Sequence, residues 1–79
     1  MPTREELADE ERRLRQLRFC VDLTLQIIAQ EALTVEEASK LVGAARRLAE
    51  SLFPGKGHVF DLVYQPRFRR LMAERFDLH

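Results

Sequence analysis

Few side chains in this sequence are of the types that catalyse reactions or bind metals. The two histidines are His58 and the terminal His79, and neither lies at the spacing of a metal-ligand motif. Asp61 follows His58 by one helical turn, which is a common arrangement of surface pairs. The sequence shows no nucleophile beside a base and no paired carboxylates for general acid–base work. We therefore predict that the protein is not an enzyme and has no catalytic, metal-binding or cofactor-binding residues.

Two other features invite a chemical interpretation. The run Pro54-Gly55-Lys56-Gly57 places glycines around a lysine, but a Walker phosphate loop needs wider glycine spacing, a Ser or Thr after the lysine and a strand in front. We interpret it as a turn. Cys20 is the single cysteine, so an internal disulfide is excluded, and its apolar neighbours indicate a small buried hydrophobic side chain rather than a reactive thiol.

Arginines cluster around an aromatic residue near the C-terminus. Arg67, Arg69, Arg70 and Arg75 surround Phe68, a pattern typical of phosphate or single-stranded nucleic-acid binding. The favoured alternative is that Phe68 faces the core and the arginines lie in solvent near the end of a helix, where cations are stabilised. The formal net charge is zero, with 13 basic and 13 acidic residues, so the chain lacks the basic excess of most nucleic-acid binders.

A second group of arginines lies in a segment that resembles a known DNA-binding module. Leu33-Thr34-Val35-Glu36-Glu37-Ala38-Ser39-Lys40-Leu41-Val42-Gly43-Ala44-Ala45-Arg46-Arg47 resembles the opening of excisionase and MerR-type modules. The resemblance covers about a quarter of the chain and uses common residue types. It implies a helix-turn-helix with its turn at Gly43, and it implies that Arg46 and Arg47 face the DNA groove.

The segment departs from that pattern after Gly43. The family usually has a Ser or Thr there to cap the recognition helix, whereas this chain has Ala44 and Ala45, which favour a helix interior. The apolar spacing also continues through Gly43 without a change of phase. We therefore expect one continuous helix here and keep a DNA-binding regulator that uses Val35–Phe53 as the alternative.

The element that organises the rest of the chain is its most apolar run, Leu17–Ala29. Its apolar side chains would spread over roughly 240° of a helix, while Phe19–Ile27 also alternates as a strand does. Helix is favoured because Glu5–Gln16 contains strong helix formers and no second convincing strand exists for pairing. We predict a helix over about residues 3–30, with an intermolecularly paired strand as the alternative.

Such a helix is too long and too apolar for a small isolated domain. It would measure roughly 42 Å at 1.5 Å per residue, against a diameter of about 30 Å for a compact domain of this size. A second chain packed along it would account for both features, and a symmetric homodimer is the simplest such assembly. Another helical protein is the alternative partner. The predicted interface residues are Leu17, Cys20, Val21, Leu25 and Ile28.

Clear signals mark the remaining elements. Thr34 and Glu37 form a capping box that begins a second helix over about residues 35–53, antiparallel to the first because the connection is short. A turn follows over residues 54–57. The third helix, over about residues 58–76, is interrupted at Pro66, which opens its second part. The predicted fold is a single all-α domain over residues 1–79, a three-helix unit assembled as a helical dimer.

These features predict a small interaction module or subunit that self-associates through the apolar Leu17–Ile28 surface. The N-terminus lacks the apolar segment of a secretory signal. The Leu17–Ala29 run is too short to span a membrane and carries Arg18 and Asp22. We therefore expect a cytoplasmic protein with no membrane partner, and nucleic acid is a disfavoured partner.

Overall fold

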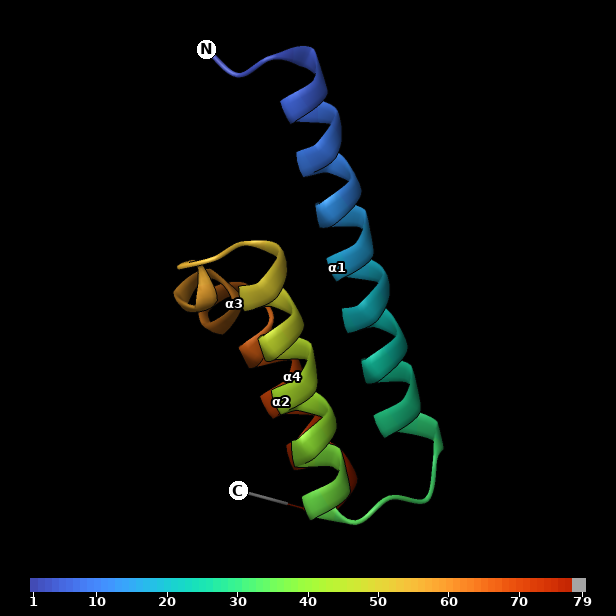
Figure 1. Cartoon of the computed structure of the whole chain (residues 1–79). Helices are drawn as coiled ribbons and strands as arrows, with labels where there is room; N and C mark the ends of the chain where they lie inside the picture. The colour runs from blue at the N-terminus through green and yellow to red at the C-terminus, as the bar shows by residue number, and fades with distance from the viewer. Residues whose placement is uncertain (78–79) are drawn as a thin grey trace.

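The computed structural model describes residues 1–77, and this part of the chain is all-helical. Four helices follow one another: α1 (Arg4–Gln30), α2 (Val35–Leu52), α3 (Gly57–Val63) and α4 (Gln65–Phe76) (Figure 1). The predicted all-α class is confirmed. The alternative of a strand over Phe19–Ile27 is wrong, because these residues lie inside α1.

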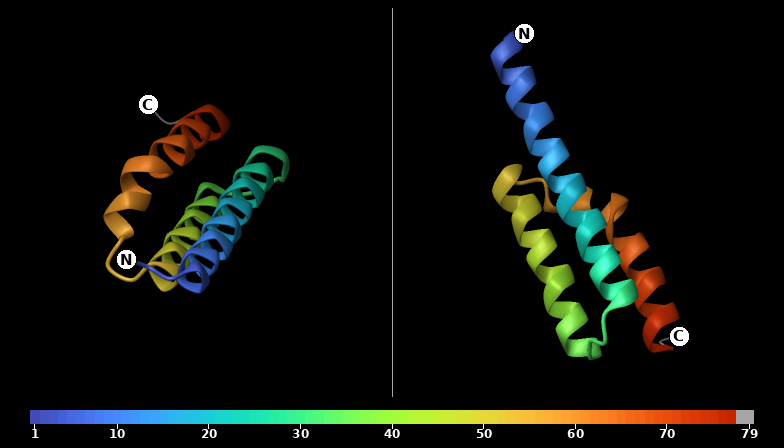
Figure 2. Two further views of the ribbon diagram at one scale, coloured as in Figure 1. Left: turned by 90° about the horizontal axis from the view of Figure 1, so that it is seen from above. Right: turned by 90° about the vertical axis from the view of Figure 1, so that its right-hand side faces the viewer.

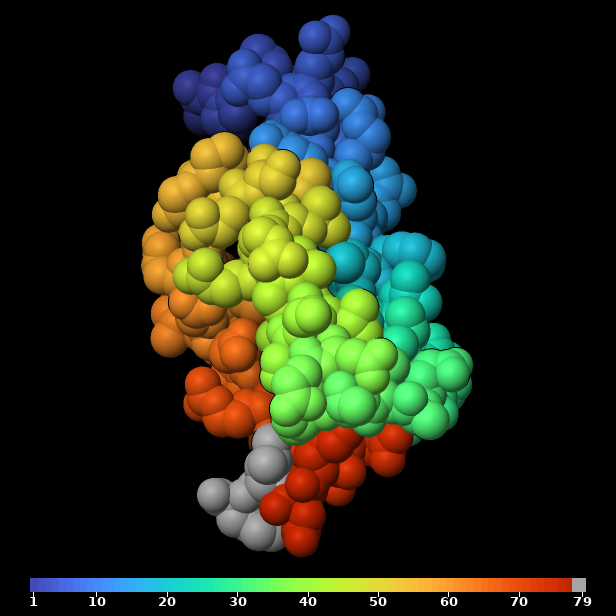
Figure 3. Space-filling model, turned by 60° about the horizontal axis from the view of Figure 1, so that its bottom comes forward, coloured from blue at the N-terminus to red at the C-terminus, as the bar shows by residue number. Residues whose placement is uncertain are grey.

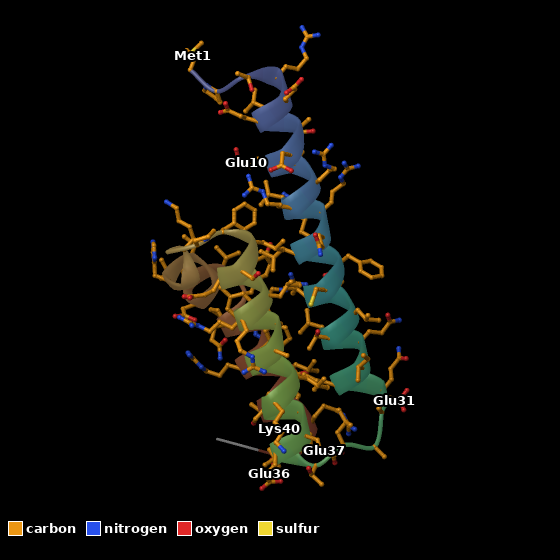
Figure 4. All side chains as sticks on the ribbon, viewed as in Figure 1. Met1, Glu10, Glu31, Glu36, Glu37 and Lys40 are labelled. Carbon is orange, nitrogen blue, oxygen red and sulfur yellow. The ribbon has the colours of Figure 1, made fainter. Side chains whose placement is uncertain are left out.

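Side-chain caps fix where the two long helices begin. The Thr3 hydroxyl accepts a hydrogen bond from the Glu6 amide at 3.1 Å and begins α1. At the start of α2, the Thr34 hydroxyl accepts from the Glu37 amide at 3.1 Å, and the Thr34 amide donates to the Glu37 carboxylate at 3.0 Å. These two bonds are the predicted capping box. Figure 4 shows Glu37 beside the connection between the two helices.

The helices form two layers. The α1 and α2 helices make an antiparallel hairpin, and α3 and α4 pack together against one side of it (Figure 2). The α4 helix contacts both members of the hairpin. The opposite side of the hairpin therefore has no helix over it within residues 1–77.

A single core lies between the two layers. In α2 it is made of small residues spaced by three and four, so the neighbouring helices approach closely. In the second layer, the ring centroids of Phe60 and Phe68 lie 6.1 Å apart, and Tyr64 packs on Phe60 at 5.6 Å. The buried apolar residues are Leu17, Val21, Ile28, Ala38, Val42, Ala45, Ala49, Phe60 and Phe68.

The predicted interruption near Pro66 separates α3 from α4, but it lies one residue earlier than expected. Tyr64 ends α3 and precedes α4 with φ −103° and ψ −34°, while Gln65 is already helical. The Tyr64 carbonyl accepts from the amides of Arg67 and Phe68 at 3.0 and 3.2 Å. Proline is tolerated here because first-turn amides need no partner within the helix.

The predicted turn ends α2 and reverses the chain. Gly55 has φ 80°, a left-handed conformation that glycine adopts without strain. The Lys56 amide donates to the Phe53 carbonyl at 3.0 Å and closes the turn.

The helix-turn-helix alternative is not supported at its central position. Gly43 lies inside α2, which continues without a break from Val35 to Leu52. The resemblance to excisionase and MerR-type modules therefore does not extend to their turn, and Ala44 and Ala45 continue the helix as their propensities indicate.

The α1 helix extends beyond the other helices and makes the molecule elongated, with principal-axis extents of 47 × 21 × 15 Å. Its first turns lie beyond the end of α2 and have no helix beside them (Figure 1). Every residue from Met1 to Arg12 is exposed. The expectation that this helix is longer than the domain behind it is confirmed.

Candidate interaction surface

The predicted interface residues are divided between the core and its margin. Leu17, Val21 and Ile28 are only 5%, 0% and 0% exposed, because this face of α1 packs against the chain's own later helices. Cys20 and Leu25 are half-buried and also pack against the core. The assignment of Leu17, Val21 and Ile28 to a surface between chains is therefore corrected: in this structure they belong to the core of one chain.

The apolar run nevertheless leaves large side chains in solvent. Phe19 is 70% exposed and Leu23, one turn later, is 45% exposed. Ile27, one further turn along, is half-buried and is not part of the core cluster. These three residues share one side of α1, because residues four apart lie on the same face of a helix.

Contacts of α1 with α4 show which way this side faces. Asp22 lies 3.7 Å from Arg67 of α4, and Leu25 lines a shallow hollow together with Leu71 of α4. These contacts occupy one flank of α1. Leu23 and Ile27 lie on the other flank and face away from the second layer.

The α2 helix likewise has one flank that borders α4 and one flank that faces away from it. Ser39, Gly43 and Arg46 line a hollow that borders α4. Leu41 and Leu48, seven residues apart, lie on the opposite flank and are half-buried, and Leu41 also packs against the edge of the core. We name the uncovered apolar side of the hairpin the open face. It consists of Phe19, Leu23, Ile27, Leu41 and Leu48.

The two arginines of the DNA-binding alternative have different surroundings. The Arg46 guanidinium donates two hydrogen bonds to the Asp61 carboxylate, at 2.8 and 3.0 Å, and lies 3.7 Å from Glu50. These hydrogen bonds lower the pKa of Asp61 and raise that of Arg46 from their ordinary values. Gly57 makes room for this group, since a Cβ there would collide with the Glu50 carboxylate. Arg47 is exposed.

The C-terminal arginines do not form one basic surface. Arg67 lies beside Asp22 of α1, and Arg69 lines the hollow on the α2 side of α4. Arg70 lies with Leu25 in the hollow on the α1 side. Arg75 donates to the carbonyl oxygens of Ile28 and Glu31 at 3.0 and 2.9 Å, and so caps the end of α1.

A groove lies where the protruding part of α1 meets the second layer. We name it the end groove. It has a volume of about 410 Å³ and separates α1 from α3. Apolar side chains dominate its lining, with Glu10 contributed by α1 and Lys56 by the turn. Leu14, Phe53, Val59 and Val63 are among the lining residues.

Potential metal ligands, membrane spans and histidines are distributed as follows in the part of the chain that the structure describes. No group of three or more potential metal ligands occurs among residues 1–77. No helix in the same part of the chain combines the length and apolar character of a membrane span. His58 is exposed on α3, and His79 lies outside the described residues. Comparisons with protein-family models, with curated proteins and with solved structures found no match to this chain.

Proposed function

We propose that this protein is a small helical interaction module that self-associates through the open face. The observation that carries the proposal is the exposure of Phe19, 70%, and of Leu23, 45%, on the side of the hairpin that no helix covers. Ile27, Leu41 and Leu48 extend this apolar surface across both helices of the hairpin. Contiguous apolar surface of this kind marks interaction sites in soluble proteins.

A second copy is the simplest occupant of the open face. The five residues that define the face are all uncharged, so a complementary surface must also be apolar, and the same face of another copy supplies one. A two-fold axis would place each Phe19 against the apolar side chains of the other copy and bury both faces together. The α1 part of this surface, Phe19, Leu23 and Ile27, lies within the predicted Leu17–Ile28 run, on the opposite side of α1 from the core.

The DNA-binding alternative receives less support. Arg46 is already hydrogen-bonded to the Asp61 carboxylate. The turn that would present a recognition helix is absent from α2. The net charge of zero does not favour DNA binding either, because binding to phosphates depends on an excess of basic side chains.

The test is sedimentation equilibrium in about 0.5 M sodium chloride, where contacts between exposed charges are screened. We expect the wild-type mass to rise with concentration from 9.3 kDa towards twice that value. The double substitution Phe19→Glu plus Leu23→Glu should raise the dissociation constant at least about 100-fold, because burying one such side chain contributes about 1.5–3 kcal/mol and 1.4 kcal/mol is tenfold.

The matched control is Leu62→Glu. Leu62 is 75% exposed on α3 and lies outside the open face, so this variant should associate as the wild type does. Circular dichroism should show unchanged helicity for both variants, since the substituted side chains are exposed. A wild-type chain that remains monomeric at every concentration, or an equal effect of the control, would contradict the proposal.

A further inference from the structure

Two uncharged stripes run along the open face, one on each helix of the hairpin. Each stripe repeats at alternating spacings of three and four residues, which keep its members on one side of the helix and are typical of helices that interlock. No charged side chain falls on either stripe, although 33% of the chain is charged. The α1 stripe is Gln16, Phe19, Leu23 and Gln26, and the α2 stripe is Leu41, Ala44, Leu48 and Ser51.

The nearest charges lie along the outer edge of each stripe. The positions that follow a stripe residue, such as Cys20 and Ala45, pack against or within the core, so the positions that precede one lie on the outer edge. In interlocking helices, charges at such flanking positions determine the choice of partner and its orientation. The charged residues at these positions are Arg15, Asp22, Lys40 and Arg47.

Two of these charges are accessible to another molecule. The Asp22 side chain is 69% exposed, and its contact with Arg67 is long, at 3.7 Å. Arg47 is exposed and makes no ion pair within residues 1–77. Asp22 immediately precedes Leu23 of the α1 stripe, and Arg47 immediately precedes Leu48 of the α2 stripe.

The hairpin sets the level at which the two stripes lie beside each other. The hydrogen bond of Arg13 to the Leu52 carbonyl fixes the level at one end, and the short connection after Gln30 fixes it at the other. Figure 3 shows α2 beside the later part of α1, with the N-terminal end of α1 projecting beyond it. Between these two points, Phe19 lies at the level of residues 44–48 of α2.

We propose that the two copies associate with α1 of each on α2 of the other, related by a two-fold axis parallel to the helices. This inference rests on the proposed function and specifies which surface of the second copy receives Phe19. An axis in this direction keeps every residue at its own level, so Phe19 arrives between Ala44 and Leu48 of the other copy. The small Ala44 leaves room for the ring, and the two hairpins together form a four-helix bundle.

Charge complementarity favours this arrangement. Helical side chains lean towards the N-terminus of their own helix. Across the antiparallel pair of α1 and the other copy's α2, Asp22 and Arg47 therefore lean towards each other, and the two-fold axis forms this pair of unlike charges twice. Arg15 and Arg47 lean apart across the same pair, so their like charges are not brought together.

An axis across the helices would bring like charges together instead. It would lay α1 on α1 and α2 on α2. When Phe19 of one copy interlocks with Leu23 of the other, the two Asp22 carboxylates converge, and the two Arg47 guanidinium groups converge on the α2 pair in the same way. Like charges that face each other across an interface disfavour that pairing.

The experiment is a charge-reversal cycle with Asp22→Arg, Arg47→Asp and the variant that carries both. Sedimentation equilibrium in about 0.05 M sodium chloride keeps the contacts between exposed charges only weakly screened. Each single reversal should raise the dissociation constant at least about fivefold, since two attractive contacts become repulsive. The double reversal restores unlike charges at both contacts and should return the constant to within about twofold of the wild type.

Three control variants make the result specific. Glu74→Arg and Arg69→Asp make the same changes of charge at exposed positions of α4 outside the open face, and should associate as the wild type does. Arg67→Ala removes the contact of Asp22 within its own chain and should also leave association unchanged. Circular dichroism should show unchanged helicity for every variant, because the substituted side chains are exposed.

The outcomes separate this pairing from the proposed function. Single reversals without effect, or a double reversal that stays as weak as the singles, would overturn the pairing. If Phe19→Glu plus Leu23→Glu still separated the copies in that case, association through the open face would stand. A wild-type chain that is monomeric at every concentration would overturn both.

Discussion

Two arginines of this protein cap helices other than their own. Arg13 of α1 donates to the Leu52 carbonyl at 3.2 Å and lies over the Phe53 ring at 5.4 Å, at the end of α2. Arg75 of α4 donates hydrogen bonds to two carbonyl oxygens at the end of α1. These three hydrogen bonds join residues 39 to 47 positions apart, so no local pattern in the sequence predicts them. In the sequence Arg75 falls within a basic cluster, whereas in the structure it caps the end of α1.

Carboxylates at two places make stability depend on pH. The Thr34 amide, and then the Thr34 hydroxyl, lower the pKa of Glu37 from its ordinary 4.5, and Arg46 lowers that of Asp61 from 3.8. A lowered folded-state pKa means that the unfolded chain binds the proton more readily. The stabilisation is therefore complete above these ordinary values and is lost as the pH falls through the lower folded-state values.

Urea unfolding at pH 7 and at pH 3 checks this linkage. We expect the wild type to lose stability on acidification and Glu37→Gln to lose less, because glutamine keeps the capping bond without titrating. Asp61→Asn should likewise reduce the loss of unfolding free energy between pH 7 and pH 3. An identical acid loss in wild type and both variants would show that these two carboxylates do not contribute.

At the scale of the helix, the local signals were sufficient to predict the elements. Thr34 and Glu37 define the start of α2, Pro54 and Gly55 follow its end, and Pro66 accounts for the separation of α3 from α4. Periodicity was not sufficient to assign the faces of α1. Apolar side chains spread over roughly 240° of α1, so they lie on more than one side of the helix. Which side becomes the core depends on where α4 packs.

Gly43→Ala tests whether α2 is continuous. A Cβ at this position would meet only the flexible end of Arg47, at 3.4 Å. Alanine should therefore raise the free energy of unfolding by about 1 kcal/mol, the difference in helix propensity between the two residues. Thermal and urea unfolding measure the effect. A loss of stability would instead indicate that Gly43 occupies a turn conformation that alanine does not tolerate.

At the scale of the whole molecule, the structure divides one apolar run between the core and the surface. Leu17, Val21 and Ile28 build the core of the single chain, while Phe19 and Leu23 remain exposed, and it is these two side chains that we propose for association. The sequence alone indicated an excess of apolar surface over what one short chain covers. It did not indicate which side chains make up that excess, because this depends on contacts of α1 with α2 and α4.

The most direct measurement compares Val21→Glu with Phe19→Glu by circular dichroism and sedimentation equilibrium in about 0.5 M sodium chloride. Val21→Glu should unfold the chain, since it buries an unpaired charge at a position with no exposure. Phe19→Glu should keep full helicity and weaken self-association. A folded Val21→Glu variant, or a Phe19→Glu variant that associates as strongly as the wild type, would contradict this division of the helix.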